Sequence, residues 1–161
     1  MDIRSKRKGP AGALSNFTPR RFTVRGIECH SMEGFLQSLK FQNAAMQREV
    51  CKLTGLAAKR KGARKHWQER QTLWWQGEEI KRESQEYQDL LDDAFSSLFV
   101  YNEKAKACLL STGDAVLTHT MGRSNPKETV LTEREFCGRL MRLKAAMHDD
   151  PLLGYEDETT R

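Results

Sequence analysis

Apolar side chains recur at the three- and four-residue spacing of amphipathic helices in two long stretches of the chain. The first predicts a helix that begins at Ser31, whose hydroxyl can cap it, and runs to about Gln47. The second predicts a helix that begins after Ser84. Its expected core face is Tyr87, Leu90, Leu91, Ala94, Phe95 and Leu98. Both helices need a core to cover these apolar stripes.

Shorter helices are predicted elsewhere. Pieces are expected around Val50 and over 56–58, and another over about 103–110, ending near Thr112-Gly113. Thr132 and Glu135 have the spacing of a capping box, which predicts the start of a final helix. The expected core face of this last helix is Phe136, Leu140 and Leu143. Residues 119–130 are rich in Gly, Ser, Asn and Pro and predict a loop.

Two hairpins interrupt the helical pattern. The strands 22–24 and 27–29 flank Arg25-Gly26, and the strands 73–75 and 79–81 flank Gln76-Gly77. We expect the second hairpin to be a surface insertion, with Trp74 and Trp75 used for packing within it. The predicted fold is therefore α+β, a mainly helical single domain with small β-hairpins. We expect a flexible basic tail over 1–12, the folded domain over 13–147 and an acidic tail over 148–161.

Composition narrows the class of protein. The 161 residues are 38% hydrophobic and 30% charged, as in a soluble globular domain. No apolar run is long enough to cross a membrane, and the charged start is not followed by the apolar core of a signal peptide, so we expect a cytoplasmic protein. The four cysteines lie far apart and the four histidines form no ligand pattern. We therefore expect reduced thiols and assign no metal site.

The net charge of +5 is unevenly distributed. Basic residues crowd the start of the chain and the segment 59–70, whereas the last residues are acidic. Such a basic patch suits nucleic acid, and it suits the phosphates of a nucleotide equally well.

Glu33 is the strongest candidate for a catalytic residue. On a helix, Glu33, Gln37 and Lys40 share one stripe beside the apolar face, although such a stripe can also be a solvated, salt-bridged surface. A carboxylate beside a cleft can stabilise a sugar cation or take a proton from water. An N-glycoside whose base leaves readily needs only one such group, so a single candidate carboxylate is compatible with N-glycosidic chemistry.

Other residues could hold a nucleotide. Trp67 follows the basic residues Arg64 and Lys65, which combines a stacking plane with positive charge, although a packing tryptophan is the alternative. Asn16 could donate to a ribose hydroxyl or a base edge above Phe17, or it could simply form a turn.

The loop after position 118 offers a further set of polar groups. His119 can act near neutral pH, Gly122 allows close backbone approach and Arg123 can bind an anion. The alternative is an ordinary connecting loop.

Taken in order, these segments resemble the NADAR superfamily of YbiA-like N-glycosidases. The resemblance spans roughly residues 14 to 143. The matching pieces, in chain order, are 14–17 (LSNF), the helix from Ser31-x-Glu33 through Gln37, Lys40 and Phe41, 64–67 (RKHW) and 109–112 (LLST). The family counterparts are an SNF motif, a T/S-x-E-H-x-x-Q-x-x-K-F helix, an R-K-N-W segment and an L-L-x-T element.

The resemblance implies a mainly helical α+β fold and cleavage of N-glycosidic bonds in phosphorylated or ADP-ribose-related compounds. Some relatives act on riboflavin-pathway intermediates, and others remove ADP-ribose from modified guanine. It implies Glu33 as the catalytic carboxylate, Trp67 as a stacking residue, and Asn16 and Lys40 as groups that hold the sugar-phosphate or orient Glu33. The implied partner is a nucleotide or ADP-ribose-type molecule, free or as ADP-ribosylated nucleic acid, with no cofactor and no membrane.

This sequence also departs from the family pattern. Gly34 replaces the histidine that follows the glutamate, residues 119–123 (HTMGR) replace a W-G-D type motif, and residues 130–136 replace a G-x-N-x-L-G stretch. The lost Trp and Asp would have supplied a second stacking face and a second carboxylate. A non-catalytic ADP-ribose or nucleotide-binding module and a basic nucleic-acid-binding domain are therefore the alternatives to an enzyme.

Overall fold

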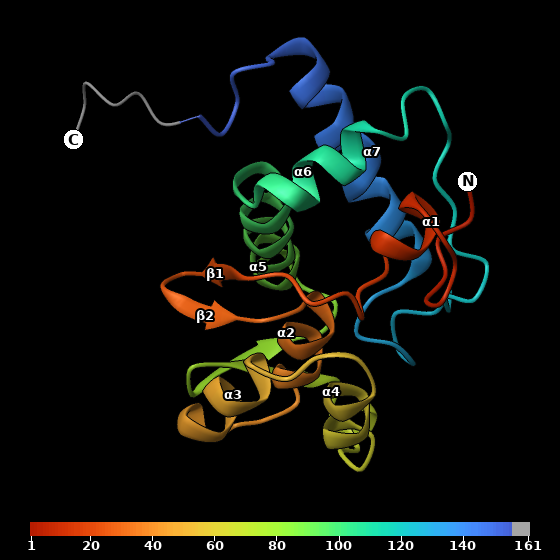
Figure 1. Ribbon diagram of the computed structural model, residues 1–161. Helices are drawn as coiled ribbons and strands as arrows, with labels where there is room; N and C mark the ends of the chain where they lie inside the picture. Colours follow the sequence, from red (N-terminus) through yellow and green to blue (C-terminus); the bar gives the residue numbers. More distant parts are fainter. Residues whose placement is uncertain (156–161) are drawn as a thin grey trace.

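Two groups of helices and two antiparallel hairpins make up the fold in the computed structural model, which describes residues 1–155 (Figure 1). In one group α2 (Met32–Ser38) packs against both α3 (Ala44–Cys51) and α4 (Gly55–Gly62). In the other, α7 (Glu133–Asp149) packs against α5 (Gln85–Ser96) and α6 (Glu103–Leu110). The fold is α+β and mainly helical in a single domain, as the sequence predicts.

The first hairpin joins the two helical groups. It consists of β1 (Phe22–Val24) and β2 (Ile27–Cys29), with Phe22 opposite Cys29. β1 packs on the second group, through α5 and the π-helical turn η2 (Ser97–Tyr101), whereas β2 packs on α2 and α3. The turn contains Gly26 at positive φ, which is the conformation that the sequence required of it.

The second hairpin, β3 (Thr72–Trp75) with β4 (Glu78–Lys81), corrects the expectation of a surface insertion. Because side chains alternate across a strand, Leu73 and Trp75 point into the core, and the ring of Trp75 meets that of Phe35 edge-on at 5.6 Å. The opposite face carries Trp74, which is only half buried. The hairpin is thus part of the core on one side only.

The helix expected from Ser31 to about Gln47 is two helices. α2 ends at Ser38 because its terminal carbonyls find partners outside the helix: Leu39 O accepts the Trp74 N–H at 2.8 Å, and Ser38 O accepts the Gln47 side-chain amide at 3.0 Å. Asn43 then caps α3 by accepting the Met46 N–H at 2.9 Å. Lys40 therefore lies in the connecting turn, not on the helix that carries Glu33.

The later helices begin where the sequence predicts. Ser84 accepts the Tyr87 N–H at the start of α5, and α6 has the expected bounds. Both hydrogen bonds of the α7 capping box are present. The Glu135 carboxylate accepts the Thr132 N–H at 2.8 Å, and the Thr132 hydroxyl accepts the Glu135 N–H at 3.1 Å. The four cysteines are free thiols.

The N-terminal segment is not a flexible tail. Ile3 is completely buried, Asp2 forms a β-bridge with Thr118, and the Met1 amino group donates to Val116 O at 2.6 Å. The short helix α1 (Pro10–Ala13) follows. These contacts fix the start of the chain beside the loop after α6.

The expected C-terminal tail overlaps the end of α7. Beyond that helix, Leu153 O accepts a hydrogen bond from Lys106, and the Lys106 ammonium lies 4.4 Å from the ring centre of Tyr155. Residues 156–161 lie outside the described residues. Across the described part, none of the helices combines the length and apolar character needed to span a bilayer.

Candidate functional site

A cavity of about 230 Å³ lies between α2, α4 and the loop 119–132. An adjoining hollow of about 320 Å³ opens toward the N-terminal segment at Arg4 and Ser5. The residues that line both are Asn16, Phe17, Glu33, Lys59, His119 and Met121, and we call the combined space the Glu33 cavity. It brings together seven of the residues selected from the sequence, namely Asn16, Phe17, Glu33, Gln37, His119, Gly122 and Arg123.

Glu33 sits in the first turn of α2, and two local bonds fix its backbone. The Ser31 hydroxyl caps the helix by accepting the Gly34 N–H at 2.9 Å, and the Glu33 N–H donates to Asn16 O at 2.9 Å. The second bond ties the Asn16-Phe17 segment, which lies between α1 and β1, to the start of α2.

The Glu33 carboxylate has one protein partner and an altered pKa. Gln37, one turn along α2, donates from Nε2 to Glu33 Oε1 at 2.8 Å. Within residues 1–155 no group hydrogen-bonds to Oε2. Burial raises the pKa of Glu33, and the Gln37 bond together with the charges of Lys40 and Lys59 opposes this only in part. A carboxylate of this kind is a better proton acceptor than an exposed one.

Gln37 is held in place by Gly62 of α4. A Cβ at Gly62 would lie 1.8 Å from Gln37 Oε1, so only glycine leaves room for this amide. Gln37 Oε1 itself is buried without a hydrogen-bond partner. The close contact between α2 and α4 thus aims the Nε2 end of the amide at Glu33.

The structure also explains why position 34 is glycine and not histidine. A Cβ at Gly34 would lie 2.4 Å from the carbonyl oxygen of Leu53 and 2.9 Å from that of Cys51. The turn between α3 and α4 therefore fills the space that a side chain here would need. A histidine at this position does not fit this arrangement.

His119 forms one wall of the cavity with a defined orientation. Its Nδ1 lies 2.8 Å from Ile3 O, an atom that only accepts, so Nδ1 carries the proton and Nε2 of the neutral ring is the acceptor. The ring meets Phe136 edge-on at 5.4 Å. Gly122 lies against it, because a Cβ there would be 2.7 Å from His119 Cδ2. The N-terminal segment thus orients a site residue.

Positive charge surrounds the single carboxylate. Lys59, Arg123 and, from the N-terminal segment, Arg4 line the cavity, whereas Glu33 is the only acid among the lining residues of the described chain. Arg4 is held by Asp2 at 2.7 Å and by Thr120 at 3.0 Å. An anionic group such as a phosphate finds favourable charge here.

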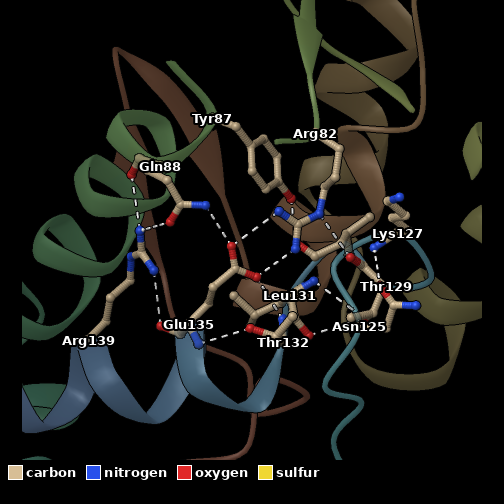
Figure 2. A network of polar contacts seen from close by, with 11 residues as sticks. Arg82, Tyr87, Gln88, Asn125, Lys127, Thr129, Leu131, Thr132, Glu135 and Arg139 are labelled. Carbon is tan, nitrogen blue, oxygen red and sulfur yellow. Dashed lines mark hydrogen bonds and ion pairs between the residues drawn. The ribbon is translucent and has the colours of Figure 1, made fainter. Parts of the chain in front are cut away.

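A buried polar network supports the remaining wall, residues 129–132 (Figure 2). Arg82 is almost completely buried and binds both carboxylate oxygens of Glu135, at 3.1 and 2.6 Å, while its Nε donates to Thr129 O at 2.9 Å. Tyr87 donates its hydroxyl to Val130 O. The charged network thus fixes the carbonyls of the wall from behind.

Three predicted site residues lie elsewhere. Trp67 is buried and lines a different cavity, which it shares with Lys40, and Arg64 lines a third. The expectation that Trp67 stacks on a base beside Glu33 therefore does not match this geometry. Lys40 still acts on Glu33 through its charge, and burial lowers its own pKa while Glu33 opposes this change.

Several site residues were not selected from the sequence. In the sequence Lys59 and Arg4 are only members of basic runs, and Gly62 carries no signal of its own. Met121 lies inside a segment that was selected, but it carried no signal of its own. Across the described residues no group of His, Cys, Asp or Glu is placed to hold a metal ion.

Comparison with known proteins gives one family, one relative and one solved structure. A family model described as Bacteriophage protein GP30.3 matches residues 8–145. An uncharacterized 17.1 kDa protein in the Gp30–rIII intergenic region of Enterobacteria phage T4 is 34% identical over 149 residues, which are 91% of this chain and 98% of that protein. The NMR structure of the E. coli protein YbiA superposes with a TM-score of 0.63 over 98% of this chain and 90% of YbiA, at 17% identity. The chain therefore has a YbiA-like fold, as the resemblance implies.

Proposed function

The chain belongs to the Bacteriophage protein GP30.3 family, and from that premise and the Glu33 cavity we propose that it is an N-glycosidase. Its substrate is a nucleotide-like or ADP-ribose-linked compound, with ADP-ribosylated guanine and riboflavin-pathway intermediates as the two candidates that the resemblance offers. The reaction is hydrolysis of the bond between the sugar C1′ and a nitrogen of the base.

One observation carries the proposal: a partly buried, hydrogen-bonded carboxylate faces a cavity lined otherwise by neutral and cationic groups. A nucleotide brings negative phosphates and develops positive charge at C1′ as the bond to nitrogen breaks. Lys59 and Arg123 match the phosphates, and Glu33 matches the developing cation. The cavity thus has charge of the right sign for both parts of such a substrate.

The proposed hydrolysis uses water as its second reactant. The C1′–N bond breaks and its electron pair leaves with the base, while Glu33 stabilises the ribosyl cation. Water then attacks C1′, Glu33 accepts the proton that water releases, and the proton finally goes to the base. The raised pKa of Glu33 favours this transfer, because a carboxylate accepts a proton more readily when burial disfavours its charge.

The other cavity residues bind and orient. The Asn16 side chain and His119 Nε2 are placed for sugar hydroxyls, and Phe17 offers an apolar face for the sugar or base. Gln37 is a positioning residue, because it acts through Glu33. Trp67 has no part in this cavity.

The test measures the release of free base by chromatography from ADP-ribosylated guanosine and from a panel of nucleoside phosphates. Glu33→Gln keeps the shape and the Gln37 contact, and it should reduce turnover by about 10²- to 10⁴-fold. Glu28→Gln, which changes an exposed carboxylate on β2, is the matched control and should leave turnover unchanged. Full activity of Glu33→Gln would contradict the proposal, and tight calorimetric binding without turnover of any ligand would favour the non-catalytic binder.

A further inference from the structure

A second concave surface begins where the Glu33 cavity ends. Helix α4 supplies Lys59 to the Glu33 cavity, but its next residues Arg60 and Lys61 line a hollow of about 1100 Å³. This hollow meets another of about 620 Å³ at Lys65, which lines both. We call the combined surface the basic groove.

The cations of the basic groove have few partners in the fold, although Lys65 contacts the Phe41 ring and the charge of Lys40 acts on Glu33. Lys40, Arg60, Lys61, Arg64, Lys65 and Arg70 line it, and within residues 1–155 none of them forms an ion pair. Three acids also line the groove, and one of them, Glu79, is paired with Lys81 at 2.9 Å. The groove therefore keeps a clear excess of unpaired positive charge.

Helix electrostatics accounts for only part of this cluster. Cations in the last turn of a helix are favoured by its dipole, which explains Arg60 and Lys61 at the end of α4. Arg64, Lys65 and Arg70 lie beyond the helix, and Lys40 comes from the turn after α2. Segments far apart in the sequence thus bring to one surface six cations that form no ion pair within residues 1–155.

Three aromatic side chains line the groove: Phe41 and Trp67 are each only 6% exposed, whereas Trp74 is half buried. One face of the second hairpin is in the core, and its other face, with Trp74 opposite Glu79 and Thr72 opposite Lys81, lines the smaller hollow. Trp74 is half buried and so has an accessible ring. In the larger hollow the Lys65 ammonium lies 4.8 Å from the ring centre of Phe41.

We propose that the basic groove binds single-stranded nucleic acid. Unpaired cations beside an accessible indole suit a chain in which phosphates alternate with exposed bases, since base stacking is available to unpaired strands. A duplex hides its bases and would leave these two hollows unfilled. A mononucleotide would use one hollow and leave most of the cations without a partner. The groove does not include Glu33, so this proposal stands independently of the glycosidase.

Fluorescence anisotropy of a labelled twelve-nucleotide oligothymidylate, titrated with the full chain, tests the proposal. If roughly four phosphates are contacted, the logarithm of the binding constant should fall with the logarithm of salt concentration with a slope of about −3. A duplex of the same length and a nucleoside monophosphate should each bind at least about tenfold more weakly, since a duplex hides the bases that would stack on Trp74 and a mononucleotide reaches only some of the cations.

Two variants and a matched control locate the surface. Arg64→Glu with Lys65→Glu should weaken binding and reduce the magnitude of the salt slope by about 1 to 2. The control, Lys104→Glu with Arg142→Glu, makes the same charge change at exposed positions of α6 and α7, away from α4 (Figure 1), and should weaken binding much less. Trp74→Ala should weaken binding about tenfold with an unchanged slope.

Thermal unfolding of each variant establishes that it is folded, and Glu33→Gln should bind the oligonucleotide as tightly as the unmodified chain. Three results would overturn the proposal: no binding at low salt, equal loss of affinity in the groove and control variants, or tighter binding of the duplex. Loss of activity in Glu33→Gln with oligonucleotide binding retained would separate the two proposals, because it would concern the glycosidase alone.

Discussion

The chemical role that we propose for Glu33 comes with a cost to the fold. Burial raises its pKa, which means that the folded chain holds the proton of this carboxyl more tightly than the unfolded chain does. Stability gained from this proton is fully present below the ordinary pKa of glutamate and is lost as the pH rises through the folded-state value. At neutral pH the ionised side chain therefore destabilises the native state.

Glu33→Gln should consequently be more stable than the unmodified chain at pH 7, because glutamine carries no charge to desolvate and can still accept from Gln37. The difference should shrink at pH 4, where Glu33 is largely protonated. Urea denaturation at the two pH values measures the free energy of unfolding of each chain. A variant that is less stable at pH 7, or a difference that does not change with pH, would contradict the proposed environment of Glu33.

Gly62 is the second residue with a specific requirement. Gly62→Ala should lower the free energy of unfolding by about 1 to 3 kcal/mol, since the added methyl group must displace the Gln37 amide. The same change in a Gln37→Ala background should cost much less, because the obstructing side chain is gone. Chemical denaturation of the four chains gives this double-mutant cycle.

Gly138→Ala is the matched glycine control. Its added Cβ would meet only the far end of Arg142, so the substitution should be neutral or should stabilise α7 by up to about 1 kcal/mol. Equal costs for Gly62→Ala in both backgrounds would show that Gln37 is not the obstacle.

Among the elements, the caps and hairpin turns were predictable and the end of α2 was not. Ser84, the Thr132–Glu135 box and the glycine turns act within a few residues, so the sequence carries their signal. α2 ends because Trp74 and Gln47, distant in sequence, take its last carbonyls. The apolar spacing continues across this break, and it therefore predicted one helix and placed Lys40 on the wrong element.

The same distinction applies to the site. Asn16, Glu33 and Gln37 were found because a short motif or one helical turn places them, and the loop 119–123 because of its polar character. Lys59, Gly62 and Arg4 owe their positions to the packing of α4 and of the N-terminal segment on α2 and the loop, for which a single sequence holds no local signal.

The polar network behind residues 129–132 contains a carboxylate, Glu135, whose pKa is lowered. Burial by itself raises the pKa of Glu135, but hydrogen bonds from Arg82, Gln88 and Thr132 outweigh it and the net pKa is lowered. Arg82→Ala should cost about 3 to 5 kcal/mol at pH 7, because it leaves a largely buried carboxylate without its partner. The cost should fall at acid pH as Glu135 is protonated.

Urea denaturation at neutral and acid pH measures the cost of Arg82→Ala, with Arg25→Ala as the control. Arg25 pairs with Asp93 at 2.8 Å, but both side chains are exposed, so its removal should cost no more than about 1 kcal/mol. Similar costs for the two arginines would show that the buried pair does not hold the wall of the cavity.

For the molecule as a whole, the N-terminal segment is the main correction to the domain boundaries. Its polar and basic composition predicted a mobile tail, yet one buried isoleucine and the backbone bonds to residues 116–118 fix it against the loop that carries His119. The composition of this segment reflects its exposed side chains, and its single apolar anchor is too short a signal to recognise.

Ile3→Ala should therefore lower the free energy of unfolding by about 2 to 5 kcal/mol, which is typical of a large-to-small change in a core. It should also reduce the proposed glycosidase turnover, because loss of the buried side chain loosens the segment whose backbone carbonyl at position 3 orients His119. Arg7→Ala, at an exposed position of the same segment, should change neither quantity by a comparable amount. Equal denaturation midpoints for the two variants would show that Ile3 does not anchor the segment and would support a flexible tail.

The most direct test of the whole account is the release of free base from ADP-ribosylated guanosine and nucleoside phosphates by the full chain and by Glu33→Gln. The unmodified chain should turn over at least one of these substrates, and the folded variant should lose about 10²- to 10⁴-fold of that turnover. Undiminished turnover in the variant would contradict the assignment of Glu33 as the catalytic carboxylate.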